Sequence, residues 1–245
     1  MKQINHRSTL GAAALAAVGL ACSAHAQHAD IEVFNDNGTL VVLDGPLFEG
    51  NFGDEGAAFT TINPGFASEP DEVDDLGFLT IPDGEEISFN VLKELFYWDG
   101  SSVAAVPTDH FVRLQQGSTL DLRVDIDGTT GFQTGYVFGE EGEAVNSMAD
   151  PEPGGFHSHI TYELLQGAGP AAGDVAGAYG FVLELEGSTL DTSDRFGVLL
   201  NFGLEEDDFE NGVSSFAAFI PEPTALAITG IGGLMLLARR RKQQA

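Results

Sequence analysis

The pattern of apolar and polar positions predicts β-structure along the central part of the chain. The clearest signal is a pair of mainly apolar runs at 29–34 and 39–43, with the dipeptide Asn37-Gly38 between them. An Asn-Gly pair in this position is typical of a β-hairpin turn. We therefore expect the ordered body to begin with a hairpin.

Further short segments of the same character follow, and the gaps between them contain Gly, Pro, Asn or Asp. The predicted strands are 77–81, 86–97, 111–115, 119–126, 132–138, 157–165, 179–186 and 196–202. The stretches 49–75 and 140–155 lack periodicity and are expected to be long surface loops. Only 204–211 indicates a short helix.

About ten short strands separated by turn residues favour an all-β fold over one with parallel crossovers. We expect a single antiparallel β-sandwich, of jelly-roll or immunoglobulin-like type, over residues 27–220. A signal helix in 1–26 would precede it, and a transmembrane helix in 221–245 would follow it.

Residues 1–26 are organised as a secretory signal. Lys2 and Arg7 come first, an apolar run of small and aliphatic residues fills 10–21, and the segment closes on Ala24-His25-Ala26. A positive start, a short apolar segment and a small-x-small motif are the parts of a cleavable signal peptide. The apolar run is also shorter than the ~20 residues that a membrane span needs. We predict cleavage after Ala26, with Ala24 as the other small residue of the motif.

The other end of the chain has three consecutive parts. Pro221, Glu222 and Pro223 precede an apolar segment at 224–238, and the basic residues Arg239, Arg240, Arg241 and Lys242 follow it. A helix over the apolar segment would be about 22 Å long, which is short for a bilayer core of ~30 Å. Its basic end would stay in the cytoplasm. This orientation places the body outside, in agreement with the signal peptide.

These three C-terminal parts, in this order, resemble a PEP-CTERM sorting signal. In that family the tail is a transient membrane anchor, which an exosortase removes as the protein passes to the outer surface of cells that make extracellular polysaccharide. The resemblance implies an exported protein of the cell surface or extracellular matrix. Its partners would be an exosortase-type enzyme, the membrane and exopolysaccharide.

The body at 27–220 is strongly acidic. It has four basic and 37 acidic side chains, and therefore a formal net charge of −33. Such a surface repels polyanions, which excludes nucleic acid as a partner, and it keeps a secreted protein hydrated. The single cysteine, Cys22, lies in the signal segment. The body therefore has no disulfide and no cysteine-based zinc site.

No catalytic motif is present in the sequence. It lacks a Gly-x-Ser-x-Gly elbow, a His-Glu-x-x-His pair and a Gly-rich phosphate loop. Paired carboxylates are too common among 37 acids to indicate a glycosidase. The segments 35–38 and 125–128 superficially resemble calcium loops, but their Gly spacing does not fit the EF-hand pattern. We predict that the protein is not an enzyme.

Four histidines remain in the body: His28, His110, His157 and His159. A spacing of two in a strand places His157 and His159 on one face, and His28 with Asp30 repeats that spacing with a carboxylate. Two imidazoles on one face can share a Zn²⁺ or Cu²⁺ ion when a neighbouring strand supplies a third ligand. From spacing alone, two interpretations stay open: a metal site, or exposed residues without a common function.

A second resemblance is spread over the body in short segments. They are 28–31, 38–40, 95–100, 155–159, 177–180 and 193–196. In this order they resemble a PEP-CTERM family of cyanobacteria that is controlled by the zinc-uptake repressor. The His-x-Asp and His-x-His parts are similar to actinobacterial surface-anchored proteins found beside metal-transport systems. The resemblance implies zinc binding outside the cytoplasm through His28, His157 and His159. From its spacing to His28, Asp30 is the candidate for a fourth ligand.

The alternative function is a carbohydrate-binding or purely structural module of the exopolysaccharide matrix, without metal. It follows from the polysaccharide association of the sorting signal. An aromatic platform of Phe96, Tyr97, Trp98 and Tyr136 would serve a sugar ligand. Aromatic side chains in strands more often belong to the core, because they bury the largest apolar areas.

Overall fold

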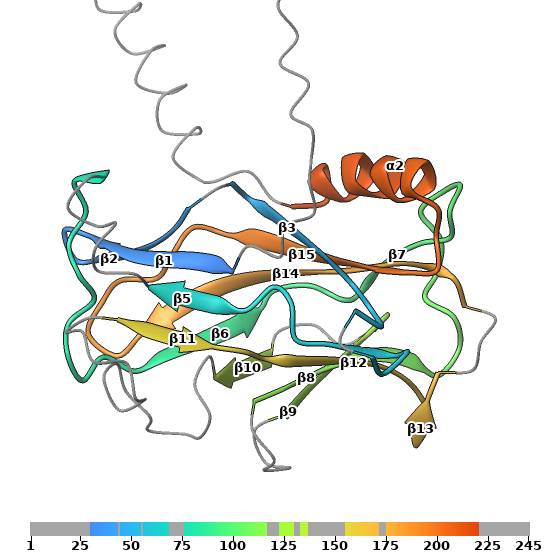
Figure 1. Cartoon of the computed structure of the whole chain (residues 1–245), viewed down its shortest axis with the longest axis horizontal. Coiled ribbons are helices and arrows are strands. Elements are labelled where there is room, and N and C mark those ends of the chain that lie inside the picture. The colour runs from blue at the N-terminus through green and yellow to red at the C-terminus, as the bar shows by residue number, and fades with distance from the viewer. Residues whose placement is uncertain are drawn as a thin grey trace, which may run out of the picture.

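The computed structural model describes residues 30–43, 45–54, 56–68, 76–116, 123–129, 133–136, 155–171 and 175–220. This part of the chain consists mostly of strands, arranged in three sheets, with one longer helix, α2 (Figure 1). The predicted signal segment, the sorting tail and His28 lie outside the described residues. Within the described ranges, no helix is long and apolar enough to cross a membrane.

The first sheet has four strands in the order β11-β5-β1-β2. Their bounds are Phe156–Ser158 for β11, Phe66–Ser68 for β5, Ile31–Asp36 for β1 and Thr39–Val42 for β2. β1 and β2 form the expected hairpin, in which Asp36 pairs with Thr39. Asn37 and Gly38 both have positive φ, 52° and 106°, as a type I′ turn requires. The hairpin prediction is therefore confirmed.

The second sheet has six strands in the order β10-β6-β14-β15-β3, and β7 also pairs with β14. The bounds are Gln133–Tyr136 for β10, Ile87–Val91 for β6, Gly177–Gly187 for β14, Phe196–Phe202 for β15, Leu47–Asn51 for β3 and Phe96–Trp98 for β7. The long strand β14 is buried on both faces. Tyr179 and Phe181 face the main core, while Ala178 and Val182 pack on the helix side.

Helix α2 (Glu206–Ala217) covers the outer face of β14 and β15. Phe209, Gly212 and Phe216 are its buried residues, at the spacing of one helical face. Gly180 and Gly197 leave space for the Phe216 ring, because a Cβ at either would lie 2.7 Å or 2.6 Å from it. The predicted helix is thus present, and it extends beyond 211 because this apolar face continues.

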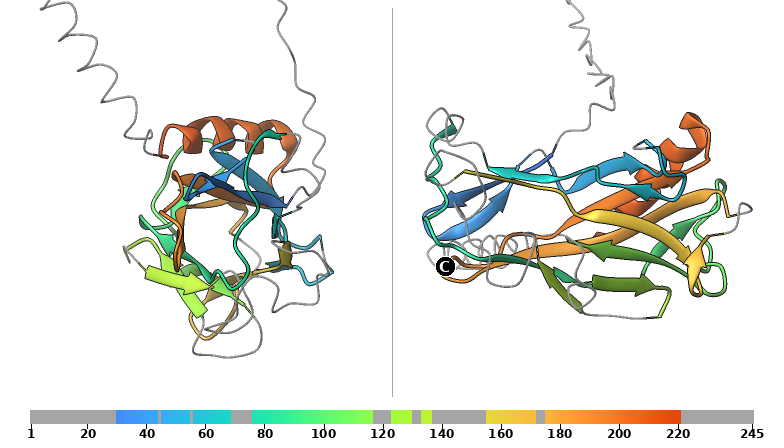
Figure 2. Two further views of the ribbon diagram at one scale, coloured as in Figure 1. Left: turned by 90° about the vertical axis from the view of Figure 1, so that its left-hand side faces the viewer. Right: turned by 60° about the horizontal axis from the view of Figure 1, so that its bottom comes forward.

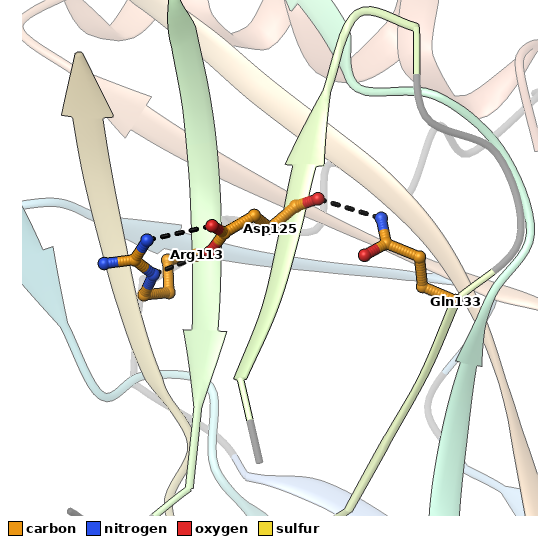
Figure 3. A network of polar contacts seen from close by, with 3 residues as sticks. All are labelled: Arg113, Asp125 and Gln133. Carbon is orange, nitrogen blue, oxygen red and sulfur yellow. Dashed lines mark hydrogen bonds and ion pairs between the residues drawn. The ribbon is translucent and has the colours of Figure 1, made fainter. Parts of the chain in front are cut away.

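The third sheet has the order β13-β12-β8-β9, with β4 beside β12. The bounds are Gly169–Pro170 for β13, Thr161–Gln166 for β12, His110–Gln115 for β8, Arg123–Asp127 for β9 and Thr60–Thr61 for β4. Arg113 of β8 makes two contacts with Asp125 of β9, at 2.6 and 2.8 Å. Gln133 of β10 donates from Nε2 to the carbonyl of Asp125 at 2.8 Å, which connects this sheet to the second (Figure 3).

One hydrophobic cluster contains residues of all three sheets, among them Ile31, Tyr162 and Phe181. In the end-on view of Figure 2, α2 lies outside the layers of strands. A smaller cluster between the helix and the second sheet includes Trp98 and Phe216. The sheets therefore share one core, and the helix adds a second apolar layer.

The expectation of an entirely antiparallel arrangement is wrong. β1 pairs with β5 in parallel, and β15 pairs with β3 in parallel. Both exceptions involve strands that lie wholly or partly within 49–75, the stretch expected to be a loop. The strands there are two to five residues long, and β5 is buried throughout, so it shows no alternation of apolar and polar residues.

Several other predicted strands have different limits. The stretch 86–97 is divided into β6 and β7, and 157–165 is divided into β11 and β12. The stretch 77–81 contributes only a single bridge, between Leu79 and Asn35. The expected loop 140–155 lies outside the described residues except for its last residue.

Candidate metal centre

Strand β11 sets the orientation of the two histidines predicted to share a face. Phe156 and Ser158 are buried, whereas His157 is exposed and His159 is half-buried. The two imidazole centroids lie 4.7 Å apart. The same-face prediction is confirmed, although β11 ends at Ser158. His159 lies where the chain leaves the first sheet for β12 of the third.

The short strand β5 lies between the histidines and β1. Ala67 pairs with Glu32 on one side and with His157 on the other. Just before β5, the carbonyl of Gly65 accepts a hydrogen bond from the amide of Ile31 at 2.8 Å. The amide of Gly65 in turn donates to Oδ1 of Asp30 at 3.1 Å. Asp30 is thereby held beside the histidines.

Three side chains meet on this face: Asp30, His157 and His159. Oδ2 of Asp30 lies 2.8 Å from Nε2 of His157. One ligand atom from each of the three residues lies within 4.8 Å of the others. Donors of a tetrahedral zinc ion with bonds of 2.0–2.1 Å are about 3.3 Å apart. The three atoms are thus near, but not at, the spacing that a single zinc ion requires.

The site is open to solvent on one side. The side chain of Asp30 is 23% exposed and that of His157 is 54% exposed. A metal ion can therefore reach the three side chains without unfolding of the sheet. An imidazole pair with one carboxylate suits zinc, copper or nickel, whereas Ca²⁺ requires six to eight oxygen ligands.

Gly65 keeps the space between Asp30 and His159 open. A Cβ at this position would lie 2.6 Å from Oδ1 of Asp30 and 2.7 Å from Nδ1 of His159. Its φ is not in the left-handed region, so backbone conformation does not require glycine here. The requirement is for space: any side chain at residue 65 would displace the carboxylate or the imidazole.

A backbone carbonyl orients His159. Its Nδ1 lies 3.1 Å from the carbonyl oxygen of Ile62, which can only accept a hydrogen bond. Nδ1 therefore carries the proton in the neutral ring, and Nε2 carries a free lone pair. Metal-binding histidines usually donate their other ring N–H to a carbonyl or carboxylate in this way.

On the core side of the site, Tyr162 contacts the segment that contains Gly65. It is fully buried, and its hydroxyl donates to the carbonyl of Pro64 at 3.0 Å. Burial raises the pKa of Tyr162 well above its ordinary value, and the negative charge of Asp30 raises it further. The phenol thus remains protonated and serves as a hydrogen-bond donor to the backbone.

The other candidate residues are placed differently. His110 lies in β8 of the third sheet and is not part of the group. Phe96, Tyr97 and Trp98 are buried, and Nε1 of Trp98 donates to the carbonyl of Asp208 in α2 at 3.0 Å. The favoured interpretation, that these three rings belong to the core, is confirmed, because they pack in the two apolar clusters. The side chain of Tyr136 lies outside the described part.

Sequence reasoning missed Gly65 and Ile62. Both lie in the stretch expected to be a loop, so nothing placed them near the histidines. The available signal was the short apolar run Phe66-Ala67 directly after Pro64-Gly65, which marks the start of β5.

Comparison of the chain with protein-family models, with curated proteins and with solved structures gave no match.

Proposed function

We propose that this protein is a non-enzymatic metal-binding protein of the cell surface or extracellular matrix, and that it binds one Zn²⁺ ion through Asp30, His157 and His159. The supporting observation is the meeting of these three side chains, within 4.8 Å, around a glycine whose Cβ would collide with two of them. The carbonyl that fixes the tautomer of His159 adds independent support.

His28 is our proposed fourth ligand. It precedes Asp30 by two positions, the spacing that places side chains of an extended chain on one face. A fourth protein ligand would complete the tetrahedral set of a structural zinc site, whereas a water in its place would leave the site open.

The terminal segments support export and transient anchoring. A signal peptide with Ala24 and Ala26 at its cleavage site would direct the chain out of the cytoplasm. The Pro221-Glu222-Pro223 motif and the arginines 239–241 would then be processed by an exosortase-type enzyme. We further propose that the scaffold is a β-sandwich, with the first sheet packed over the shared core; the common hydrophobic cluster supports this.

Calorimetric titration of Zn²⁺ into the purified, chelator-treated protein tests the proposed function. We expect one ion per chain, with binding weakened at least about 100-fold in the double variant His157→Ala, His159→Ala. Ca²⁺ should neither bind with comparable affinity nor compete. Equal, weak binding of both ions that survives the double substitution would mean that the acidic surface only gathers counterions.

The alternative, a matrix module without metal, makes the opposite prediction. Retention on polysaccharide columns by chelator-treated protein, unaffected by the double substitution, would favour it. The buried state of Phe96, Tyr97 and Trp98 argues against the aromatic sugar platform that was the less favoured interpretation of these residues.

A further inference from the structure

A second candidate binding site lies away from the proposed metal centre. A pocket of about 740 Å³ opens between β7, the segment 103–109, the start of β8 and the turn after β9. This volume falls within the range of 300–1,000 Å³ that is typical of small-molecule sites. None of Asp30, His157 and His159 lines it.

His110 is among the residues that line this pocket, and one of its ring nitrogens has no hydrogen-bond partner among the described residues. Its side chain is buried, only 5% exposed, and Nδ1 lies 2.9 Å from the carbonyl oxygen of Thr108. Because that oxygen can only accept, Nδ1 carries the proton in the neutral ring and Nε2 is left as an acceptor. Nε2 is buried and has no hydrogen-bond partner among the described residues. A buried acceptor of this kind calls for a donor.

The charged groups that line the pocket all have the same sign. Glu94, Asp109 and Asp127 contribute carboxylates, and no lysine or arginine is among its described lining residues. Two cations contact rings of the lining but are already paired. Lys93 lies over the ring of Phe219, with Nζ 4.1 Å from the centroid, and donates to the carbonyl of Phe219 at 2.8 Å. Arg113 lies over the ring of Phe111, with its guanidinium carbon 5.3 Å from the centroid, and pairs with Asp125. The pocket therefore offers acceptors and negative charge to a ligand.

Most of the remaining lining is apolar. Leu95, Val106, Phe111 and Phe219 contribute aliphatic and aromatic surface, and Val103 is 59% exposed. An apolar body would gain by covering this surface, while a charged head group would find the acceptors.

We propose that this pocket binds a small organic cation, a primary ammonium compound with an apolar body. Because Nε2 of His110 has almost no accessible surface, the side chains around it must shift to admit the ammonium group, which then donates a hydrogen bond to Nε2. The carboxylates of Glu94, Asp109 and Asp127 balance the charge of the ammonium group. The apolar body packs against the segment 103–106 and the ring of Phe111. This binding is independent of the proposed zinc site.

Benzylamine, which is protonated at neutral pH, is the probe that tests the proposal, and benzyl alcohol is its neutral counterpart of similar shape. We expect saturation-transfer NMR on the full-length protein to show benzylamine binding with a Kd of about 1 mM or tighter. Benzyl alcohol should bind at least about tenfold more weakly, because it carries no charge. The benzylamine affinity should also fall with rising salt concentration.

Two substitutions separate the contributions. His110→Phe keeps a ring of similar size but removes the acceptor, and should weaken benzylamine binding about tenfold or more. Asp109→Asn removes one charge at a residue with φ of +63°, a conformation that asparagine tolerates, and should weaken it several-fold. His159→Ala is the matched control and should leave benzylamine binding unchanged. Thermal melts establish that each variant is folded.

Three results would overturn the proposal. They are equal affinity for benzylamine and benzyl alcohol, affinity that survives both pocket substitutions, and no binding of benzylamine up to about 10 mM. If glucose binds in a manner that depends on His110 while benzylamine does not, the pocket is a sugar site instead. Should His110→Phe fail to fold, the pair of probes and Asp109→Asn still decide the question.

Discussion

The histidines of the first and third sheets differ in what surrounds them. His157 and His159 project from one face of a sheet, beside a carboxylate, with solvent on one side. His110 is buried at the start of β8, and its Nε2 faces no donor among the described residues. Several ligands that converge and remain accessible favour a metal ion, whereas a buried acceptor beside a pocket lined by apolar side chains and carboxylates favours an organic cation. The residue type is the same, and the position in the fold decides its chemistry.

The largest expected effect is the loss of zinc binding in the first sheet without any change in the pocket. The double variant His157→Ala, His159→Ala should lose at least about 100-fold in Zn²⁺ affinity, because two of the three ligands are removed. His110→Phe should retain wild-type zinc affinity. Calorimetric titration of both variants measures the difference. A similar loss in His110→Phe would show that the two regions are not independent.

Gly65→Ala should have the next largest effect. The new Cβ would lie 2.6 Å from the Asp30 carboxylate and 2.7 Å from His159, so one of the ligands must move. We expect about tenfold weaker zinc binding and a loss of about 1–3 kcal/mol in unfolding free energy, measured by denaturant titration. Gly169→Ala is the matched control, since a Cβ there meets nothing within 4 Å. Equal effects of the two substitutions would contradict the role assigned to Gly65.

Asp30→Asn should weaken zinc binding by about tenfold, because it removes the anionic ligand but keeps an oxygen that can accept from the amide of Gly65. The exposed residue Asp207 of α2 provides a control, and Asp207→Asn should change zinc affinity little. If both substitutions reduce affinity equally, the acidic surface as a whole attracts the ion, and the ligand set is wrong.

The smallest effect concerns pH. Burial, and then the charge of Asp30, raise the pKa of Tyr162 above its ordinary value of 10.0. The folded protein therefore holds this proton more tightly than the unfolded chain does. The resulting stability is fully present below pH 10 and is lost as the pH rises further. Tyr162→Phe should cost about 1 kcal/mol at neutral pH by loss of the bond to Pro64, and should reduce the alkaline loss. Denaturant titrations at pH 7 and above pH 10 measure both.

Local signals in the sequence were sufficient for part of this structure. Asn37 and Gly38 both adopt positive φ readily, as a tight hairpin turn requires, so the first hairpin could be predicted from these two residues. The two-residue period of a strand placed His157 and His159 on one face without knowledge of their partners. Both inferences depend on neighbours in the chain, and both are confirmed.

The remaining part depends on pairing between distant segments. Asp30 reaches the histidines only because β1 pairs with β5 in parallel and β5 pairs with β11. β5 consists of three buried residues in a stretch rich in Gly and Pro, and no local sequence pattern indicates which strands it pairs with. The roles of Gly65 and Ile62 follow from this pairing, so they became visible only in the structure. The pocket around His110 likewise arises from segments that are far apart in the sequence.

The most direct test of the proposed zinc site is long-range ¹H–¹⁵N NMR of the histidine side chains, recorded before and after addition of one equivalent of Zn²⁺. We predict that the ring nitrogens of His157 and His159 shift together as the ion is bound, while those of His110 do not move. Unchanged signals of His157 and His159, at a zinc concentration that saturates the protein, would contradict the account.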